Sequence, residues 1–155
     1  MPLAPKIASF PAIRGALRFY QVCSIITGTF LLLLVAEMVV KYAFGYELFL
    51  GGSGGFLYFS PLTFDGKSSG NGLNVSMTIL IVHGWFYVVY LFSCFRVWSL
   101  MRWPFWRFIL LALGGVVPFL SFIMEAIVAR DVKHYLAERE AADAAQPAPS
   151  TQGAR

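Results

Sequence analysis

The sequence predicts an all-α membrane protein, in which three transmembrane helices form a small bundle and an extended loop rich in glycine and aromatic residues lies outside. Composition supports this class, since the 155-residue chain is 58% apolar and 13% charged, whereas soluble domains are about 45–50% apolar and about 25% charged. The mean hydropathy is +0.68. Three apolar runs each reach the roughly 20 residues that cross a bilayer as a helix.

The three runs divide the chain into one transmembrane domain and two polar ends. We expect spans at about 19–44, 73–98 and 105–128, within a transmembrane domain at 19–130, because backbone groups in lipid must bond within a helix. Residues 1–18 are expected to form a cytoplasmic stub, and 131–155 a polar, partly disordered tail. The first run exceeds the apolar core of about 7–15 residues found in signal peptides, which favours an uncleaved signal-anchor.

The distribution of lysine and arginine predicts the orientation. Six basic residues and no acidic residue flank the bilayer on the side of the stub and the short loop 99–104. The positive-inside rule therefore predicts a multi-pass plasma-membrane protein with a cytoplasmic N-terminus and an extracytoplasmic C-terminus. Lys41, Arg130 and Lys133 weaken this assignment, because they flank spans on the outer side. The basic residues form no continuous face, so we expect no nucleic-acid partner.

The loop 45–72 is expected outside the membrane. It holds eight of the fourteen glycines together with six aromatic residues, and glycine-rich stretches resist regular structure. We expect the loop to lie on the membrane interface, where aromatic rings are favoured. A docking surface for a partner is the alternative.

Four ionisable residues within the spans form the candidate site, namely Glu37, Lys41, His83 and Glu125. Such residues are rare at membrane depth and usually face protein or water. Alternating helix direction puts all four in the outer half of the bilayer, and Glu37 and Lys41 have the i, i+4 spacing of a helix ion pair. We expect a polar clamp of interhelical hydrogen bonds. A proton-titrating site and a metal site are the alternatives.

Six further residues are predicted to serve helix packing: Ser24, Gly28, Gly84, Gly114, Gly115 and Pro118. Ser24 and Gly28 give the first span a pair of small residues four apart, which lets helix backbones approach. Gly84 leaves space beside His83 for another helix. The glycine pair and Pro118 are expected to bend the third span, as membrane helices tolerate.

Three blocks of sequence resemble a known family. They are Glu37-x-x-x-Lys41-Tyr42, "VHGWFYVVYL" in the second span and "RWPFWRFILLALGGVVPFLSFIMEAIVAR" in the third. Their order and spacing, from about Phe19 to Arg130, resemble the DUF3817 family of small three-helix integral membrane proteins, which is common in actinobacteria. The loop 45–72 is longer than the family usually has. The resemblance implies a fold and a membrane location, and it brings no catalytic mechanism.

The chain carries none of the common nucleotide-binding, metalloprotease or hydrolase motifs, so we expect no enzyme, no cofactor and no metal. We expect instead a non-catalytic accessory or assembly subunit of a larger membrane complex, such as an actinobacterial respiratory chain complex. Its partners would be the lipid bilayer and other integral membrane subunits, or further copies of the chain. The alternative is a small oligomeric channel or proton-coupled transporter that uses the histidine and glutamates within the spans.

Overall fold

The computed structural model describes residue 5 and residues 7–145. Its elements in chain order are a short 3-10 helix (Ile7–Ser9), α1 (Phe10–Ala43), β1 (Tyr46–Leu50), β2 (Leu57–Pro61), β3 (Leu73–Asn74), α2 (Val75–Met101), α3 (Phe105–Gly114) and α4 (Leu120–Ala144). Lys6 and the Pro- and Ser-rich stretch 146–155 lie outside the described residues, so the prediction of a disordered tail falls on residues that the structure does not describe.

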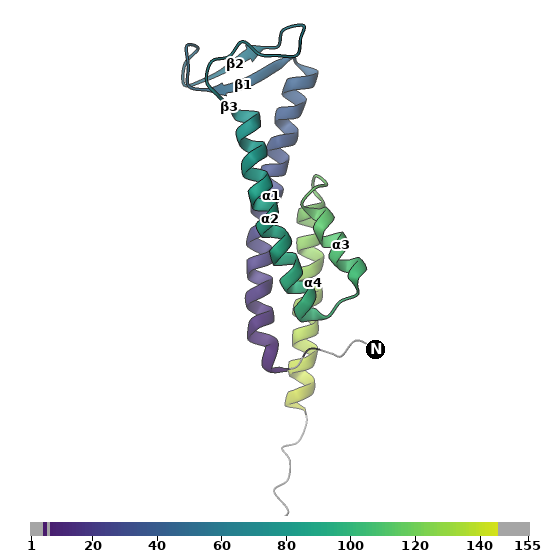
Figure 1. The fold of residues 1–155 in the computed structure, drawn as a ribbon. Helices are drawn as coiled ribbons and strands as arrows, with labels where there is room; N and C mark the ends of the chain where they lie inside the picture. Colours follow the sequence, from purple (N-terminus) through teal and green to yellow (C-terminus); the bar gives the residue numbers. More distant parts are fainter. Residues whose placement is uncertain (1–4, 6, 146–155) are drawn as a thin grey trace, which may run out of the picture.

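Helices α1 and α2 form a long antiparallel hairpin that sets the length of the molecule (Figure 1). With 34 residues, α1 is about 51 Å long at about 1.5 Å per residue. Asn74 caps α2 by accepting a hydrogen bond from the Met77 amide at 2.9 Å. Both helices are long and apolar enough to cross a membrane, and only 33% and 11% of their apolar segments are buried within the protein. The core helix of a soluble protein would be mostly buried, so this exposure fits a lipid environment.

The prediction of three transmembrane helices is wrong, because only two described helices are long and apolar enough to span. The third apolar run breaks into α3, with ten residues, and the start of α4. Ten helical residues reach only about 15 Å, half of a bilayer core. The chain reverses between Gly114 and Leu120, where Pro118 lacks a backbone donor and Phe119 adopts a left-handed φ of 65°.

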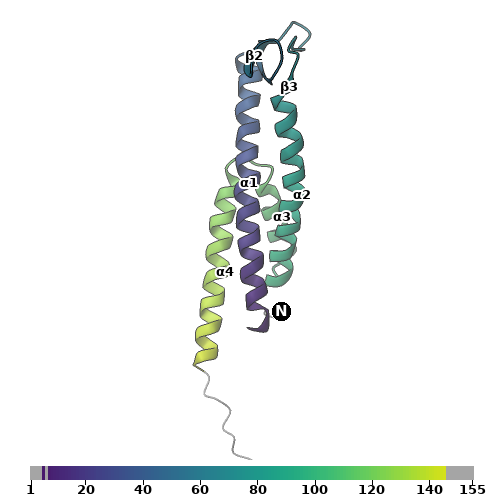
Figure 2. The ribbon, with the colours of Figure 1, turned by 90° about the vertical axis from the view of Figure 1, so that its left-hand side faces the viewer.

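The α3–α4 hairpin packs against the half of the α1–α2 hairpin that is remote from the sheet (Figures 1 and 2). Helix α4 runs antiparallel to α1, as shown by the contacts of Ser24 with Ser121 and of Arg14 with Glu140. The C-terminal end of α4 therefore lies beside the N-terminal end of α1. The expectation that the N-terminal and C-terminal regions lie on opposite sides of a membrane depended on a third full span, and the described helices do not include one.

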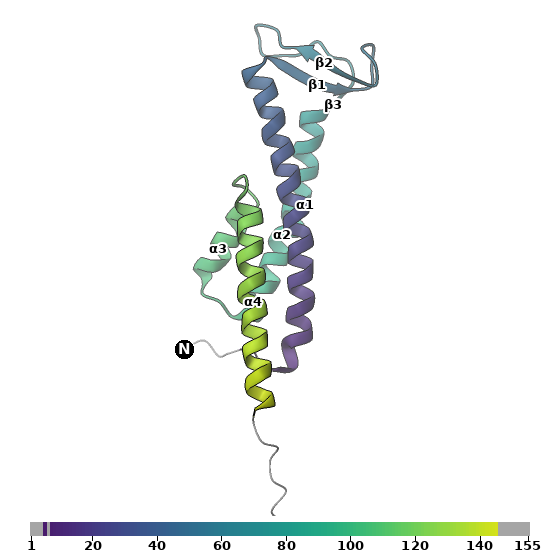
Figure 3. The same ribbon diagram turned by 180° about the vertical axis from the view of Figure 1, so that it is seen from behind.

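The prediction of an all-α fold is also wrong, because residues 45–72 contribute to a three-stranded antiparallel sheet with the order β2-β1-β3. The sheet lies across the ends of α1 and α2 (Figures 1 and 3). Gly51 and Gly52 turn the chain between β1 and β2 with φ values of 71° and 120°, which favour glycine. The Asn71 side chain then accepts hydrogen bonds from Ser53 and Tyr58, fixing the turn to the strand that follows.

The hydrophobic core lies in the four-helix half of the molecule. Its largest fully buried side chains include Tyr20 of α1, Tyr90 of α2, Leu111 of α3 and Val132 of α4. The Tyr90 hydroxyl donates to the Leu111 carbonyl at 2.6 Å, a carbonyl one turn from the end of α3. Tyr90 thus joins the α3–α4 hairpin to the α1–α2 hairpin. Near the sheet, no further helix of the described chain covers α1 and α2.

Candidate functional site beneath the sheet

Polar side chains gather where the α1–α2 hairpin meets the sheet. We call this group the sheet-end cluster, and its members are Glu37, Lys41, Glu47, Ser68, Asn74 and Ser76. They come from α1, β1, the loop before β3, β3 itself and the first turn of α2. The cluster therefore links every element at this end of the molecule except β2.

Glu47 is the centre of the sheet-end cluster. Its Oε1 atom lies 2.8 Å from Lys41 Nζ, and its Oε2 atom accepts a hydrogen bond from Ser68 Oγ at 2.5 Å. Along β1 buried and exposed positions alternate, so that Glu47 and Phe49 face the helices. A strand therefore places a carboxylate directly against the last turn of α1.

Burial and hydrogen bonding act on Glu47 in opposite directions. Burial would raise the pKa of its carboxyl, but hydrogen bonds from Lys41, Ser68 and Asn74 outweigh burial and lower the pKa to about 2. Glu47 is 5% exposed, so this ion pair is shielded from solvent and salt more than a surface pair would be. The carboxylate therefore stays charged across the physiological range and holds the sheet to α1.

Glu37 lies one helical turn below Lys41 on the same face of α1. It is 8% exposed, and its Oε2 atom accepts a hydrogen bond from Ser76 Oγ at 2.7 Å. Ser76 belongs to the first turn of α2, so this bond joins the two helices close to the sheet. The predicted pairing of Glu37 with Lys41 is thus replaced by two separate bonds, from Glu37 to α2 and from Lys41 to β1.

A cavity of about 330 Å³ opens beside the sheet-end cluster. Its apolar lining consists of Leu34, Met38, Tyr42, Met77 and Leu80. Its polar lining carries two carboxylates and one ammonium group, and hence a formal charge of −1. Among the described residues no three His, Cys, Asp or Glu side chains are placed to hold a metal ion. The contacts within this lining are the Lys41–Glu47 ion pair and the hydrogen bond from Ser76 to Glu37, which join α1 to β1 and to α2.

His83 and Glu125 lie away from the sheet-end cluster. His83 contacts the backbone of Thr27 and stacks on Tyr87 with the ring centroids 6.3 Å apart. Glu125 accepts a hydrogen bond from the Gln21 side chain at 2.5 Å. Gln21, Thr27 and Glu37 succeed one another along α1, so the three ionisable groups occupy three levels, each separated by about two or three helical turns. The structure does not bring His83, Glu37 and Glu125 together.

The small residues predicted to serve packing in α1 and at the end of α3 meet other helices. Ser24 lies against Ser121, and a Cβ atom added to Gly28 would lie 3.0 Å from the Phe122 ring. Gly114 and Gly115 lie against Tyr90 and Tyr87 in the same way. Pro118 lies in the reversal between α3 and α4. These positions hold the α3–α4 hairpin against the α1–α2 hairpin.

Gly84 differs from the other glycines of the spans. A Cβ atom added there would meet no other atom within 4 Å. Gly84 is exposed and is followed by Trp85, which is 73% exposed. The space beside Gly84 is therefore not filled by another helix of this chain.

Sequence reasoning missed Glu47 and Gln21 as functional partners. Glu47 lies in the segment YELFL, whose aromatic residues favour a strand. In a strand, Glu47 shares one face with the apolar Phe49. Gln21 precedes Glu125 by 104 positions. No local pattern links two residues that far apart, and only the return of α4 along α1 brings them into contact.

Comparisons with known proteins give one family and several relatives. A family model described as a domain of unknown function (DUF3817) matches residues 17–130. An uncharacterized protein of Mycobacterium leprae is 29% identical over 132 residues, covering 85% of this chain and 87% of the relative. Uncharacterized proteins of Mycobacterium bovis and Mycobacterium tuberculosis are each 26% identical over 121 residues, covering 78% of this chain and 79% of each relative. No solved structure matches the chain.

Proposed function

The chain belongs to the DUF3817 family, and from this premise we propose that it is a non-catalytic integral membrane protein that serves as an accessory or assembly subunit of a larger membrane complex. The α1–α2 hairpin crosses the bilayer, and the α3–α4 hairpin enters it from one side and returns to that side. Both described ends of the chain are cytoplasmic, and the sheet is extracytoplasmic. The proposal needs no catalytic site.

The charges at the ends of the helices support this placement. Arg18 and Lys41 bracket the apolar part of α1 and lie 23 residues apart, a rise of about 34 Å that matches a bilayer core of about 30 Å. Of the described basic residues, Lys41 and Lys67 lie at the sheet end, and the other eight lie at the opposite end or in α4. The return of α4 brings Arg130 and Lys133 to the side of Arg14 and Arg18. The excess of lysine and arginine on that side is therefore larger than in an arrangement with three full spans, and it favours a cytoplasmic N-terminus more strongly.

The observation that carries the subunit role is the uncovered surface around Gly84. Near the sheet, no third helix among the described residues packs against α1 and α2, and Ile81, Trp85 and Val88 are exposed around the glycine. In lipid, helices associate through close backbone approach at small residues rather than through the hydrophobic effect. An outward-facing glycine between large side chains provides a notch into which a helix of another subunit fits.

The test is copurification of partners with matched glycine variants. The full chain is tagged at its own chromosomal locus, extracted in a mild detergent, and its partners are identified by mass spectrometry. Gly84→Leu fills the notch and should remove the partner. Gly15→Leu is the matched control, since a Cβ atom at Gly15 also meets no other atom within 4 Å, and it should leave copurification unchanged.

Two results would contradict the subunit role. One is recovery of the wild-type chain alone at its native level. The other is equal loss of a partner from both glycine variants, which would indicate a general effect on helix insertion. Recovery of a second tagged copy as the sole companion would identify a homo-oligomer instead. Respiratory chain complexes, the example given by the sequence-based hypothesis, are the first assemblies to examine.

A further inference from the structure

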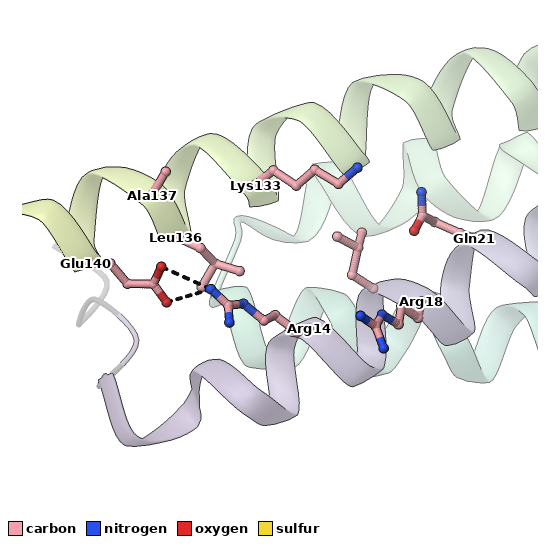
Figure 4. Close-up of a pocket in the computed structure, with 8 residues that line it drawn as sticks. Arg14, Arg18, Gln21, Lys133, Leu136, Ala137 and Glu140 are labelled. Atoms are coloured by element: carbon pink, nitrogen blue, oxygen red, sulfur yellow. Dashed lines mark hydrogen bonds and ion pairs between the residues drawn. The ribbon is translucent and has the colours of Figure 1, made fainter.

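A second cavity lies at the opposite end of the molecule from the sheet. It is a groove of about 370 Å³ between the start of α1 and the end of α4. Figure 4 shows the side chains that line it. They are Arg14, Leu17, Arg18 and Gln21 from α1 and Lys133, Leu136, Ala137 and Glu140 from α4.

The groove has an excess of positive charge. Arg14 is neutralised by Glu140, because its Nη2 atom lies 2.7 and 3.0 Å from the two carboxylate oxygens of Glu140. Within the described part of the chain, neither Arg18 nor Lys133 has an ion-pair partner, and both line the same groove. Both residues are exposed to solvent, and an anion held between them would be attracted by both charges.

The surroundings of the two cations match a phosphate that carries apolar chains. Leu17 and Leu136 are buried in the floor of the groove. The Gln21 amide donates one hydrogen bond to Glu125, and its second N–H can donate to a phosphate oxygen. Val22 and Ile25 follow Arg18 at i+4 and i+7, so they continue the same face of α1 toward the centre of the bilayer. Both are at least half exposed, which leaves that face free for an acyl chain.

We propose that this groove binds the phosphate of an anionic phospholipid head group in the cytoplasmic leaflet, with Arg18 and Lys133 as the charged contacts. Basic pockets between helices at the cytoplasmic side of a membrane are suited to such head groups. The Arg14–Glu140 pair closes the end of the groove that faces the cytoplasm. The assignment rests on the membrane placement proposed above and does not depend on any protein partner.

The test uses the full-length chain purified in detergent, so that a failure here and a failure of the subunit role can be told apart. Native mass spectrometry compares retention of phosphatidylglycerol with retention of phosphatidylcholine. Each basic residue near an anionic surface contributes about fivefold in affinity, so Arg18→Gln/Lys133→Gln should lower phosphatidylglycerol retention by about 25-fold. Arg130→Gln/Arg139→Gln removes the same charge from exposed positions of α4 that do not line the groove, and it should change retention less than threefold.

Two further measurements make the assignment falsifiable. Arg18→Lys/Lys133→Arg keeps both charges and should restore retention to within about threefold of wild type, which separates loss of the site from loss of the fold. Inorganic phosphate at millimolar concentration should not displace the lipid. Displacement by inorganic phosphate would show a small-anion site and overturn the lipid assignment, as would equal retention of the two lipids or equal loss from the Arg130/Arg139 control.

Discussion

Ser24 of α1 and Ser121 of α4 form a reciprocal hydrogen-bonded pair in the centre of the molecule. Their hydroxyl oxygens lie 2.9 Å apart, and each hydroxyl also lies within hydrogen-bond distance of the other's backbone carbonyl, at 3.0 and 2.9 Å. Both residues are fully buried. The pair fixes the height at which the α3–α4 hairpin docks on α1.

Removing either hydroxyl should weaken the docking of α4. We expect Ser24→Ala and Ser121→Ala each to lower the free energy of unfolding by about 0.5–2 kcal/mol, the range of interhelical hydrogen bonds in membranes. A double-mutant cycle in mixed micelles, followed by circular dichroism, should give a non-zero coupling energy. Thr29→Ala is the control, because the Thr29 hydroxyl bonds only within its own helix and is exposed. Strict additivity of the two serine changes would contradict the pair.

Gly115 tests the close packing at the tip of the α3–α4 hairpin. A Cβ atom there would lie 2.6 Å from the Tyr87 ring and 3.0 Å from the Tyr90 ring. Gly115→Ala should therefore destabilise the protein by about 1–3 kcal/mol through overpacking. Gly84→Ala, which enters open space, should be neutral or stabilise by up to about 1 kcal/mol through helix propensity. Thermal unfolding of both variants measures the difference, and equal effects would refute the predicted contact.

The Glu47 ion pair predicts a dependence of stability on pH. The ordinary pKa of this carboxyl is 4.5, and in the folded protein hydrogen bonds overcome the effect of burial and lower it to about 2. A lowered pKa contributes stability that is fully present above pH 4.5 and is lost as the pH falls toward 2. We expect wild type to lose on the order of 2 kcal/mol across this window.

Glu47→Gln serves as the control for that measurement. It cannot ionise, so most of the loss between pH 4.5 and 2 should disappear, while the variant is less stable than wild type at neutral pH. Tryptophan fluorescence during denaturant titrations at several pH values reports both effects. A pH profile that is the same in wild type and variant would show that Glu47 does not hold the sheet.

The antiparallel return of α4 along α1 predicts that the end of α4 lies on the cytoplasmic side of the membrane and the sheet on the other side. In intact cells, a maleimide that does not cross membranes should label Lys67→Cys, which lies in the exposed loop before β3, and should not label Ala142→Cys, near the end of α4. After lysis both should react. The native Cys23 and Cys94 are buried and free, so they give little background. Labelling of Ala142→Cys in intact cells would mean that α4 crosses the membrane.

The α1–α2 hairpin could be predicted from the sequence, and the remainder of the fold could not. Hydropathy detects an apolar run of sufficient length, but it does not distinguish one span from two half-length helices. Gly114, Gly115 and Pro118 are compatible with a bend in a membrane helix, and only the packing of Tyr87 and Tyr90 against the glycines shows that the chain reverses there.

The same limit of sequence patterns explains why only part of the candidate site could be predicted. The sequence alone indicated that Glu37 and Lys41 are unusual at that depth, and both belong to the sheet-end cluster. Their partners were hidden, because Glu47 lies on a strand in a segment whose glycines predicted an irregular loop. The expected meeting of His83 with Glu125 depended on three full spans, and it fails because α4 begins halfway along α1.

The α3–α4 hairpin packs only against the half of the α1–α2 hairpin that is remote from the sheet, so the helices together form a wedge (Figure 1). In the membrane placement proposed above, only α1 and α2 would occupy the leaflet near the sheet, and α3 and α4 would lie beside them in the other leaflet. The protein would then displace more lipid area from one leaflet than from the other. Such an inclusion distorts its surroundings least where the leaflet that holds α3 and α4 faces the convex side of a curved membrane. In that placement, the reversal at Pro118 would set the membrane curvature that suits the protein, as well as the path of its own chain.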